Sequence, residues 1–484
     1  MRLRYLALGA ALLAGVMNVA SAQSVDAALV ARGAYVARAA DCAACHTDPA
    51  AGRPYAGGCA IQSPLGTIYS TNITSSHSHG IGEWSEADFA RAVREGVAKD
   101  GTHLYPAMPY DAYSGMTDDD VHALYTYFQS VAPMDQAPKK QTSLGFPYGI
   151  RASMVAWNAL FLDHHRYESQ NGEVPDASRG KYLVDVLGHC GSCHTPRTTL
   201  MSADNGNYLA GADIGGWHAP NITSDATDGL GGWTEDEIAS FLQNGHVAGK
   251  AVAAGGMAEA VEHSLRHLSD ADLHAMAAYL KTVPARPAAV TTSKASYSYG
   301  EPASGTYDFG STAAVATETA ASAARTGTAG TPSNSGKPSD MTNGAQLFEA
   351  ACATCHQPAG SGTGDHYYPS LYRNSTTGAA TPNNLVMTIL EGVKRVGADG
   401  PTAMPAFKED LDDTQVAAIA TFVSKQFGNP GLTIDAARVA ELRRGGPPAK
   451  LQQLMPWMLG VGGLLIVALI VLMVRLATRR KRIR

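Results

Sequence analysis

The most specific chemistry in this 484-residue chain lies in one short motif that occurs three times. Each copy has two cysteines three positions apart, and a histidine follows the second cysteine directly. Such a pair of thiols can form thioether bonds to the two vinyl groups of one porphyrin, while the adjacent imidazole reaches the iron. A single copy could also be a redox dithiol or half of a zinc site. Three copies that all end in histidine predict three covalently bound haem c groups, at Cys42, Cys45 and His46, at Cys190, Cys193 and His194, and at Cys352, Cys355 and His356.

A methionine downstream of each motif is the expected second axial ligand of the iron. Met108 and Met404 each precede a proline that would brace a loop, and Met257 occupies the corresponding position of the second copy. A thioether opposite histidine raises the reduction potential of a haem. Core packing is the commoner role of methionine, and we assign that role to Met276 and Met387 because they fall on apolar helix faces.

Two histidines and one cysteine lie outside this scheme. His103 and His263 are near enough to the methionines in sequence to be rival ligands, although solvated histidines are more common in polar loops. Cys59, the seventh cysteine, belongs to no motif, and we expect a free or buried thiol. A disulfide to another chain is the alternative in an oxidising compartment. No triad, Gly-rich nucleotide loop or paired-carboxylate site is apparent, so no catalytic residue is assigned.

The motifs belong to a repeated unit that must position them. Positions in the second unit lie 148 or 149 residues after their counterparts, as in the pairs Cys42 and Cys190, Asn72 and Asn221, and Trp84 and Trp233. A shorter third copy begins at Asn343. Ser85 and Thr234 open helices as capping boxes, and each unit closes with a helix that has one apolar stripe. No segment alternates convincingly as a strand, so the expected class is all-α.

The two ends of the chain carry targeting signals. Residues 1–22 combine two arginines, an apolar run and small residues, which predicts a cleaved secretory signal. Residues 457–474 contain no charge and are long enough for one transmembrane helix, with a buried core helix as the alternative. Six cations follow within 475–484, so the positive-inside rule predicts a cytoplasmic tail and haem units on the periplasmic face. The net charge of −6 makes a nucleic-acid partner unexpected.

The order of leader, three motif units and apolar C-terminal run resembles the triple-haem cytochrome c subunit of bacterial membrane-bound dehydrogenases. The motifs that carry the resemblance are Tyr55-Ala-Gly-Gly58, Tyr105-Pro-Ala-Met108-Pro109-Tyr110 and His189-Cys-Gly-Ser-Cys-His194-Thr-Pro196-Arg197. The resemblance implies an electron-transfer subunit in the bacterial cytoplasmic membrane that does not itself oxidise the substrate. Its donor would be a catalytic dehydrogenase subunit, a flavoprotein, quinoprotein or molybdoprotein that oxidises an alcohol, sugar, gluconate or aldehyde. Its acceptor would be ubiquinone or a terminal oxidase.

Two other functions stay open at this point. A c-type haem subunit of a terminal oxidase would carry similar haems, but typically with an N-terminal anchor and fewer units. A haem enzyme would need one iron without its methionine, and Met257 is the least supported of the three because no proline follows it.

The expected domain organisation follows from the repeats and from composition. The Ala/Thr/Ser-rich linker is too poor in large apolar residues to fold, whereas the connecting segment has enough of them for a helix across two units or for a partner surface. The division is 24–132, first cytochrome c domain; 133–175, connecting segment; 176–284, second domain; 285–340, flexible linker; 341–428, third domain; and 429–456, tether to the membrane helix.

Overall fold

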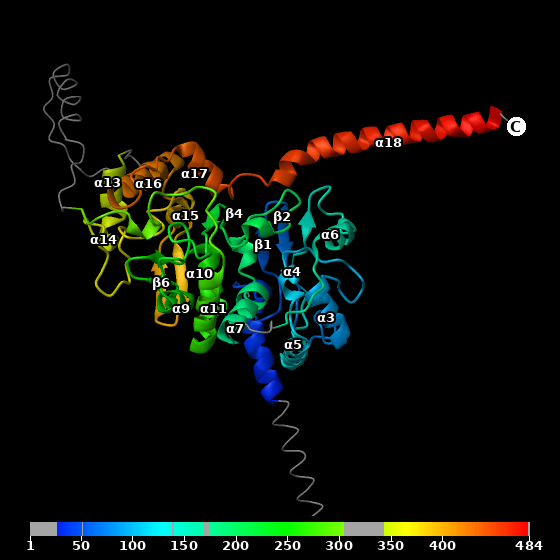
Figure 1. The fold of residues 1–484 in the computed structure, drawn as a ribbon, viewed down its shortest axis with the longest axis horizontal. Coiled ribbons are helices and arrows are strands. Elements are labelled where there is room, and N and C mark those ends of the chain that lie inside the picture. Colours follow the sequence, from blue (N-terminus) through cyan, green and yellow to red (C-terminus); the bar gives the residue numbers. More distant parts are fainter. Residues whose placement is uncertain (1–26, 51, 138–139, 169–174, 304–342, 483–484) are drawn as a thin grey trace, which may run out of the picture.

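The computed structural model describes residues 27–50, 52–137, 140–168, 175–303 and 343–482 (Figure 1). The expected leader, residues 1–22, and most of the expected 285–340 linker lie outside the described residues. Three helical units follow one another along the chain, and a long C-terminal helix extends away from the body (Figure 1).

Unit 1 begins with a helix over residues 27–39, which leads into the first cysteine motif. Ser85 caps the next long helix as a capping box, as its sequence predicts, and Thr117 caps the closing helix. The elements are α2 (Cys42–His46), β1 (Ala60–Ser63), β2 (Gly66–Tyr69), α3 (Glu86–Glu95), α4 (Tyr110–Tyr113) and α5 (Asp118–Ser130).

A connecting segment with β3 (Ser143–Leu144) and α6 (Ser153–Phe161) leads from unit 1 to unit 2. Helix α6 joins the two units, because its Asn158 accepts a hydrogen bond from Tyr110 (2.8 Å) and its Trp157 donates to the carbonyl of Leu200 (3.0 Å). In unit 2, Thr234 forms the predicted capping box of α9. Unit 2 contains α7 (Pro175–Lys181), η1 (Tyr182–Leu187), α8 (Gly191–His194), η2 (Asn205–Asn207), β4 (Ala212–Ile214), β5 (Trp217–Ala219), α9 (Glu235–Asn244), β6 (His246–Val247), β7 (Ala251–Val252), α10 (Gly255–His263), η3 (Leu265–His267) and α11 (Asp270–Thr282), and η4 (Ser296–Ser298) follows it.

Unit 3 repeats the plan in shorter form. Its elements are α13 (Gly344–Ala351), α14 (Ala353–His356), α15 (Asn383–Glu391), β8 (Val393–Gly397), β9 (Gly400–Met404), α16 (Asp413–Phe427) and α17 (Ala436–Arg443), and α18 (Lys450–Arg482) ends the chain.

A glycine allows the first and last helices of each unit to cross in direct contact. A β-carbon added at any of these glycines would lie only 1.8 to 2.2 Å from a backbone carbonyl oxygen of the closing helix. Because backbone atoms cannot rotate away, any larger residue would force the helices apart. The three crossings, which give all units the same architecture, are Gly33 on Ala123, Gly180 on Ala275 and Gly344 on Ala418.

The all-α prediction is incomplete, because the units also contain short antiparallel strands. The pairs are β1 with β2, β2 with β3, β4 with β5, β6 with β7, and β8 with β9. Most strands have two to four residues, too few for an alternating pattern to stand out. The five-residue β8 does alternate between buried and more exposed residues, and the two-residue turn Ala398-Asp399 joins it to Gly400, the first residue of β9.

Two segments predicted to be tethers are partly folded. Tyr299, in the expected linker, is buried, and its carbonyl accepts a hydrogen bond from the backbone of Arg373 in unit 3 (2.8 Å). The expected 429–456 tether contains α17, whose Val439 and Leu442 are fully buried in the core of unit 3. Two apolar residues at i and i+3 suffice to dock this short helix. Such a short apolar pattern did not predict a helix from the sequence, because the surrounding Gly and Pro residues indicate a loop.

Units 1 and 2 share one continuous hydrophobic core, to which Leu124 and Phe128 of α5 and Leu273 and Leu280 of α11 contribute. Met276 is buried in this core, as its helix position predicts. Unit 3 has its own core, which includes Met387, and Trp217 of unit 2 packs against it.

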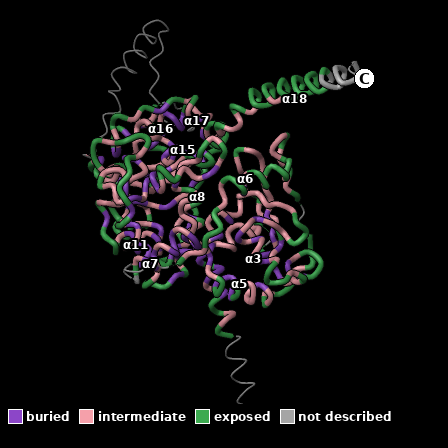
Figure 2. The backbone as a smooth tube through the Cα atoms, turned by 45° about the vertical axis from the view of Figure 1, so that its right-hand side comes forward, coloured by how far each residue is buried: buried purple, intermediate pink, exposed green. Residues whose placement is uncertain are grey.

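Helix α18 is long, apolar and mostly exposed. Residues Lys450–Met473 form a 24-residue segment that is long enough to cross a membrane, and its most apolar 18-residue window has a mean hydropathy of 2.4 and no buried residue. Figure 2 shows exposed residues along most of its length. The helix begins seven residues before the predicted start of the span at Trp457.

Candidate haem sites

Each cysteine motif folds as a short helix whose histidine has one ring nitrogen occupied. The Nδ1 atoms of His46, His194 and His356 lie 2.7, 2.7 and 3.0 Å from backbone carbonyl oxygens. A carbonyl can only accept, so each Nδ1 carries the proton and each Nε2 keeps its lone pair. That tautomer, with its ring orientation fixed by a carbonyl, is typical of a metal-ligating histidine.

The protonation of these groups also suits haem attachment. Burial lowers the pKa of His46, His194 and His356, against the opposing effect of the carbonyl hydrogen bond, so the imidazoles are neutral and able to ligate. Burial raises the pKa of Cys42 and Cys190 to about 12. Reactive redox dithiols have a lowered cysteine pKa, so these environments do not fit thioredoxin-like chemistry. A thioether has no ionisable proton, so it is compatible with this burial.

A local turn that occurs in both unit 1 and unit 2 holds two of the three carbonyls. The cysteine motif itself gave no sign of this role. The acceptors for His46 and His194 belong to Thr71 and Pro220, each directly before a buried asparagine. The Asn72 side chain accepts from the backbone and hydroxyl of Thr74 (2.9 and 2.7 Å) and donates to the carbonyl of Met134 (2.7 Å).

The second unit repeats this turn almost exactly as the first unit has it. Asn221 accepts from both groups of Thr223 (2.8 Å each) and donates to the carbonyl of Arg286 (2.6 Å). The repeated Asn-Ile-Thr therefore fixes the loop that orients each histidine.

The three methionines lie in different local structures. Met108 is in the turn before α4 and packs, like Cys42, against the shared core. Met257 also packs against this core, as Cys190 does, but it is the third residue of α10, so its placement in a loop was wrong. Met404 is the last residue of β9 and pairs with Val393. The hairpin therefore takes the place that we assigned to a Pro-braced loop.

His103, His263 and Cys59, to which no haem role was assigned, have different surroundings. The Nδ1 of His103 is buried and has no hydrogen-bond partner among the described residues. His263 ends α10. Cys59 is a half-buried free thiol, and burial raises its pKa. Its backbone N–H donates to the hydroxyl of Ser70 (3.1 Å).

Comparison with known proteins agrees with these units. The family model Cytochrome c matches residues 30–132 and 177–284, and the model Cytochrome C oxidase, cbb3-type, subunit III matches residues 339–423. The chain is 44% identical to the fructose dehydrogenase cytochrome subunit of Gluconobacter japonicus, over 91% of this chain and 89% of that protein. It is 40% identical to the gluconate 2-dehydrogenase cytochrome c subunit of Pantoea cypripedii, over 86% and 90%.

A third relative is the cytochrome c subunit of the quinone-type alcohol dehydrogenase of Gluconacetobacter polyoxogenes, which is 38% identical over 90% of this chain and 88% of that protein. Cytochrome c domains imply covalently bound haem c, which the tautomer and burial of the motif residues fit. The chain belongs to the family of cytochrome c subunits of dehydrogenase complexes.

Proposed function

We propose that this chain carries three haems c and conducts electrons from a periplasmic dehydrogenase subunit to ubiquinone or the respiratory chain. The observation that carries the proposal is the common state of the three motif histidines, each with Nδ1–H bonded to a carbonyl and Nε2 free. The third unit matches a different family model from the first two, yet its histidine has this same arrangement. We therefore assign it a haem as well.

In this assignment the chain holds each haem through two thioethers, one histidine and one methionine. A bound haem supplies a one-electron couple between ferrous and ferric iron. Cys42, Cys45, Cys190, Cys193, Cys352 and Cys355 are the attachment residues. His46, His194 and His356, with Met108, Met257 and Met404, would hold the haem iron. Two protein ligands on each iron would leave no position for substrate, which favours electron relay over catalysis.

The identity of the donor is proposed from the relatives. Their names place them with dehydrogenases of fructose, gluconate and alcohols, so we propose a partner that oxidises a CH–OH group or an aldehyde. The likeness of unit 3 to an oxidase subunit supports the alternative that this chain serves a terminal oxidase. The chain covers nearly nine-tenths of each dehydrogenase relative, which favours the dehydrogenase complex.

We further propose that α18 anchors the chain in the bacterial cytoplasmic membrane. Its most apolar window has no buried residue, and the cations after Met473 favour a cytoplasmic C-terminus and periplasmic haem units.

The direct test is to purify the tagged full chain from membranes and to identify the large subunit that accompanies it. Adding the substrate of that subunit should reduce the haems, as followed by their α-band absorbance in a stopped-flow instrument. A variant of the partner that lacks its catalytic residue is the control and should leave the haems oxidised. If the haems stay oxidised with substrate but respond to dithionite, the proposed donor is wrong.

A further inference from the structure

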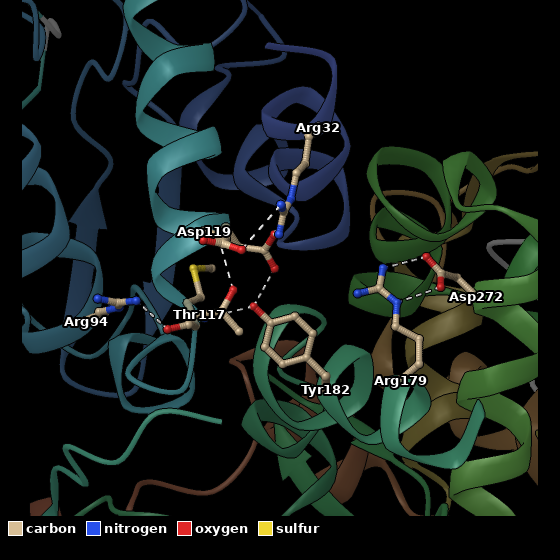
Figure 3. Close-up of polar contacts among 9 residues, drawn as sticks. Arg32, Arg94, Thr117, Asp119, Arg179, Tyr182 and Asp272 are labelled. Carbon is tan, nitrogen blue, oxygen red and sulfur yellow. Dashed lines mark hydrogen bonds and ion pairs between the residues drawn. The ribbon is translucent and has the colours of Figure 1, made fainter. Parts of the chain in front are cut away.

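Units 1 and 2 meet through a reciprocal pair of contacts. Asp120 of unit 1 accepts hydrogen bonds from its own Arg32 (2.8 and 3.0 Å) and from the Tyr182 hydroxyl of unit 2 (2.7 Å). Figure 3 shows Tyr182 pointing toward Thr117, whose backbone N–H donates to the tyrosine hydroxyl (3.2 Å). The carboxylate of Asp120 is buried, so this bond from the other unit is shielded from water.

The mirror contact runs in the opposite direction. Asp272 of unit 2 accepts from its own Arg179 (2.8 Å from both nitrogens) and from the Tyr35 hydroxyl of unit 1 (2.5 Å). Each unit therefore lends one tyrosine to a carboxylate that an arginine of the other unit already holds. Such an exchange is the arrangement of a two-fold interface, formed here within one chain.

The same interface brings the haem-attachment segments together. Helix α10, which carries Met257, packs on α2, the attachment helix of unit 1. Helix α4, which follows Met108, packs on η1, which leads to Cys190 in unit 2. Each methionine segment thus contacts the attachment region of the other unit.

Tyr113 of α4 lies at the centre of this arrangement. Its hydroxyl donates to the carbonyl of Ala40, two residues before Cys42 (2.5 Å). Its ring makes a T-shaped contact with the ring of His189, the residue before Cys190, with centroids 5.6 Å apart. Only 6% of the residue is exposed, so the contact is closed to water. One side chain therefore touches the approach to both attachment motifs.

We propose that the first two haems form one electronically coupled pair and that Tyr113 is the positioning residue that holds their attachment segments together. This inference rests on the proposed haem loading of the first two motifs. In the pair, one electron leaves the ferrous iron of one haem and reduces the ferric iron of the other, and no bond or proton changes. The shared core and the exchanged tyrosines keep the two units rigid, and Tyr113 sets the register at the haems.

The test compares three variants of the full chain by circular dichroism in the Soret band, where two closely placed haems produce a bisignate couplet. Tyr113→Leu removes the ring and the hydroxyl, whereas Tyr113→Phe keeps the ring. Tyr125→Leu is the matched control, because Tyr125 also has one aromatic neighbour, Phe89 (5.7 Å), and one carbonyl acceptor, Trp84 (2.8 Å), but both lie within unit 1.

We expect the wild type, Tyr113→Phe and Tyr125→Leu to show the couplet and Tyr113→Leu to lose it while keeping the haem content of the wild type. An unchanged couplet in Tyr113→Leu, or equal loss in Tyr125→Leu, would overturn the role of Tyr113. Absence of haem from the first two motifs of the wild type would instead refute the proposed function.

Variants that lack one attachment motif test the proposed pairing of the first two haems even if the Tyr113→Leu protein does not bind haem. Cys190→Ala with Cys193→Ala should abolish the couplet, and Cys352→Ala with Cys355→Ala should leave it. The reverse pattern, or a wild type with haem at both motifs and no couplet, would overturn the pairing.

Discussion

The glycine crossing of unit 2 offers a sharp test of the fold that positions the motifs. In Gly180→Ala the new β-carbon would lie 1.8 Å from the carbonyl oxygen of Ala275 and 2.4 Å from its carbon, against the 3.0 Å that β-carbons essentially always keep. Helices α7 and α11 must therefore separate by about an ångström or more. Helix α11 contributes Leu273, Met276 and Leu280 to the core that units 1 and 2 share, so displacing it strains the core of both units.

The size of the effect follows from two opposing contributions. Overpacking against backbone costs about 3 kcal/mol, the upper end of the usual range, since a carbonyl cannot rotate away. Alanine regains about 1 kcal/mol of helix propensity. The net loss of about 2 kcal/mol corresponds to a melting temperature lower by about 4–8 °C for a cooperative unit of this size.

Thermal unfolding followed by far-ultraviolet circular dichroism measures this difference. Gly256→Ala is the matched control, because Gly256 also lies in a helix of unit 2 and an added β-carbon there meets nothing within 4 Å. The control should be neutral or stabilised by up to about 1 kcal/mol. A Gly180→Ala protein that melts with the control or above it would refute the close crossing.

Three further results are expected. Met404→Leu should lower the reduction potential of one haem in a spectroelectrochemical titration, because thioether ligation raises that potential. The control Met387→Leu, in the core of unit 3, should leave all potentials unchanged. An unchanged potential in Met404→Leu would remove Met404 as a ligand. Burial alone would raise the pKa of Asp272, but the hydrogen bonds and charge of Arg179 outweigh it and lower the pKa. The stability that Asp272 contributes is therefore complete above its unfolded pKa and is lost as the pH falls through its folded pKa. In a plot of melting temperature against pH, Asp272→Asn should make the decline at acid pH less steep. A decline as steep as that of the wild type would contradict this. A chain ended before Lys450 should leave the membrane fraction, and its retention there would show another anchor.

Local signals in the sequence predict much of this molecule. The cysteine spacing locates the motif helices, and capping residues such as Ser85 and Thr234 mark where helices begin. The apolar stripes correctly identify the closing helices α5, α11 and α16. Each of these features depends on residues within one or two helical turns of one another, so a pattern in the sequence is sufficient to reveal it.

Features that depend on distant residues could not be predicted in this way. The carbonyl that orients His46 is 25 residues away, and the tyrosine that reaches Asp272 is 237 residues away. The repeat offset placed Met257 opposite the loop residue Met108, but tertiary packing on α2 and β8 favours a helix there. Propensity is a weak guide wherever packing of this kind opposes it.

Haem content tests the central claim most directly. The full chain, purified from membranes and extracted with acidified acetone to remove haem that is not covalently attached, should retain three haems per polypeptide by the pyridine haemochrome assay. Cys352→Ala with Cys355→Ala should reduce that number to two. A wild-type chain that retains only two haems, with no change on disabling the third motif, would contradict the account.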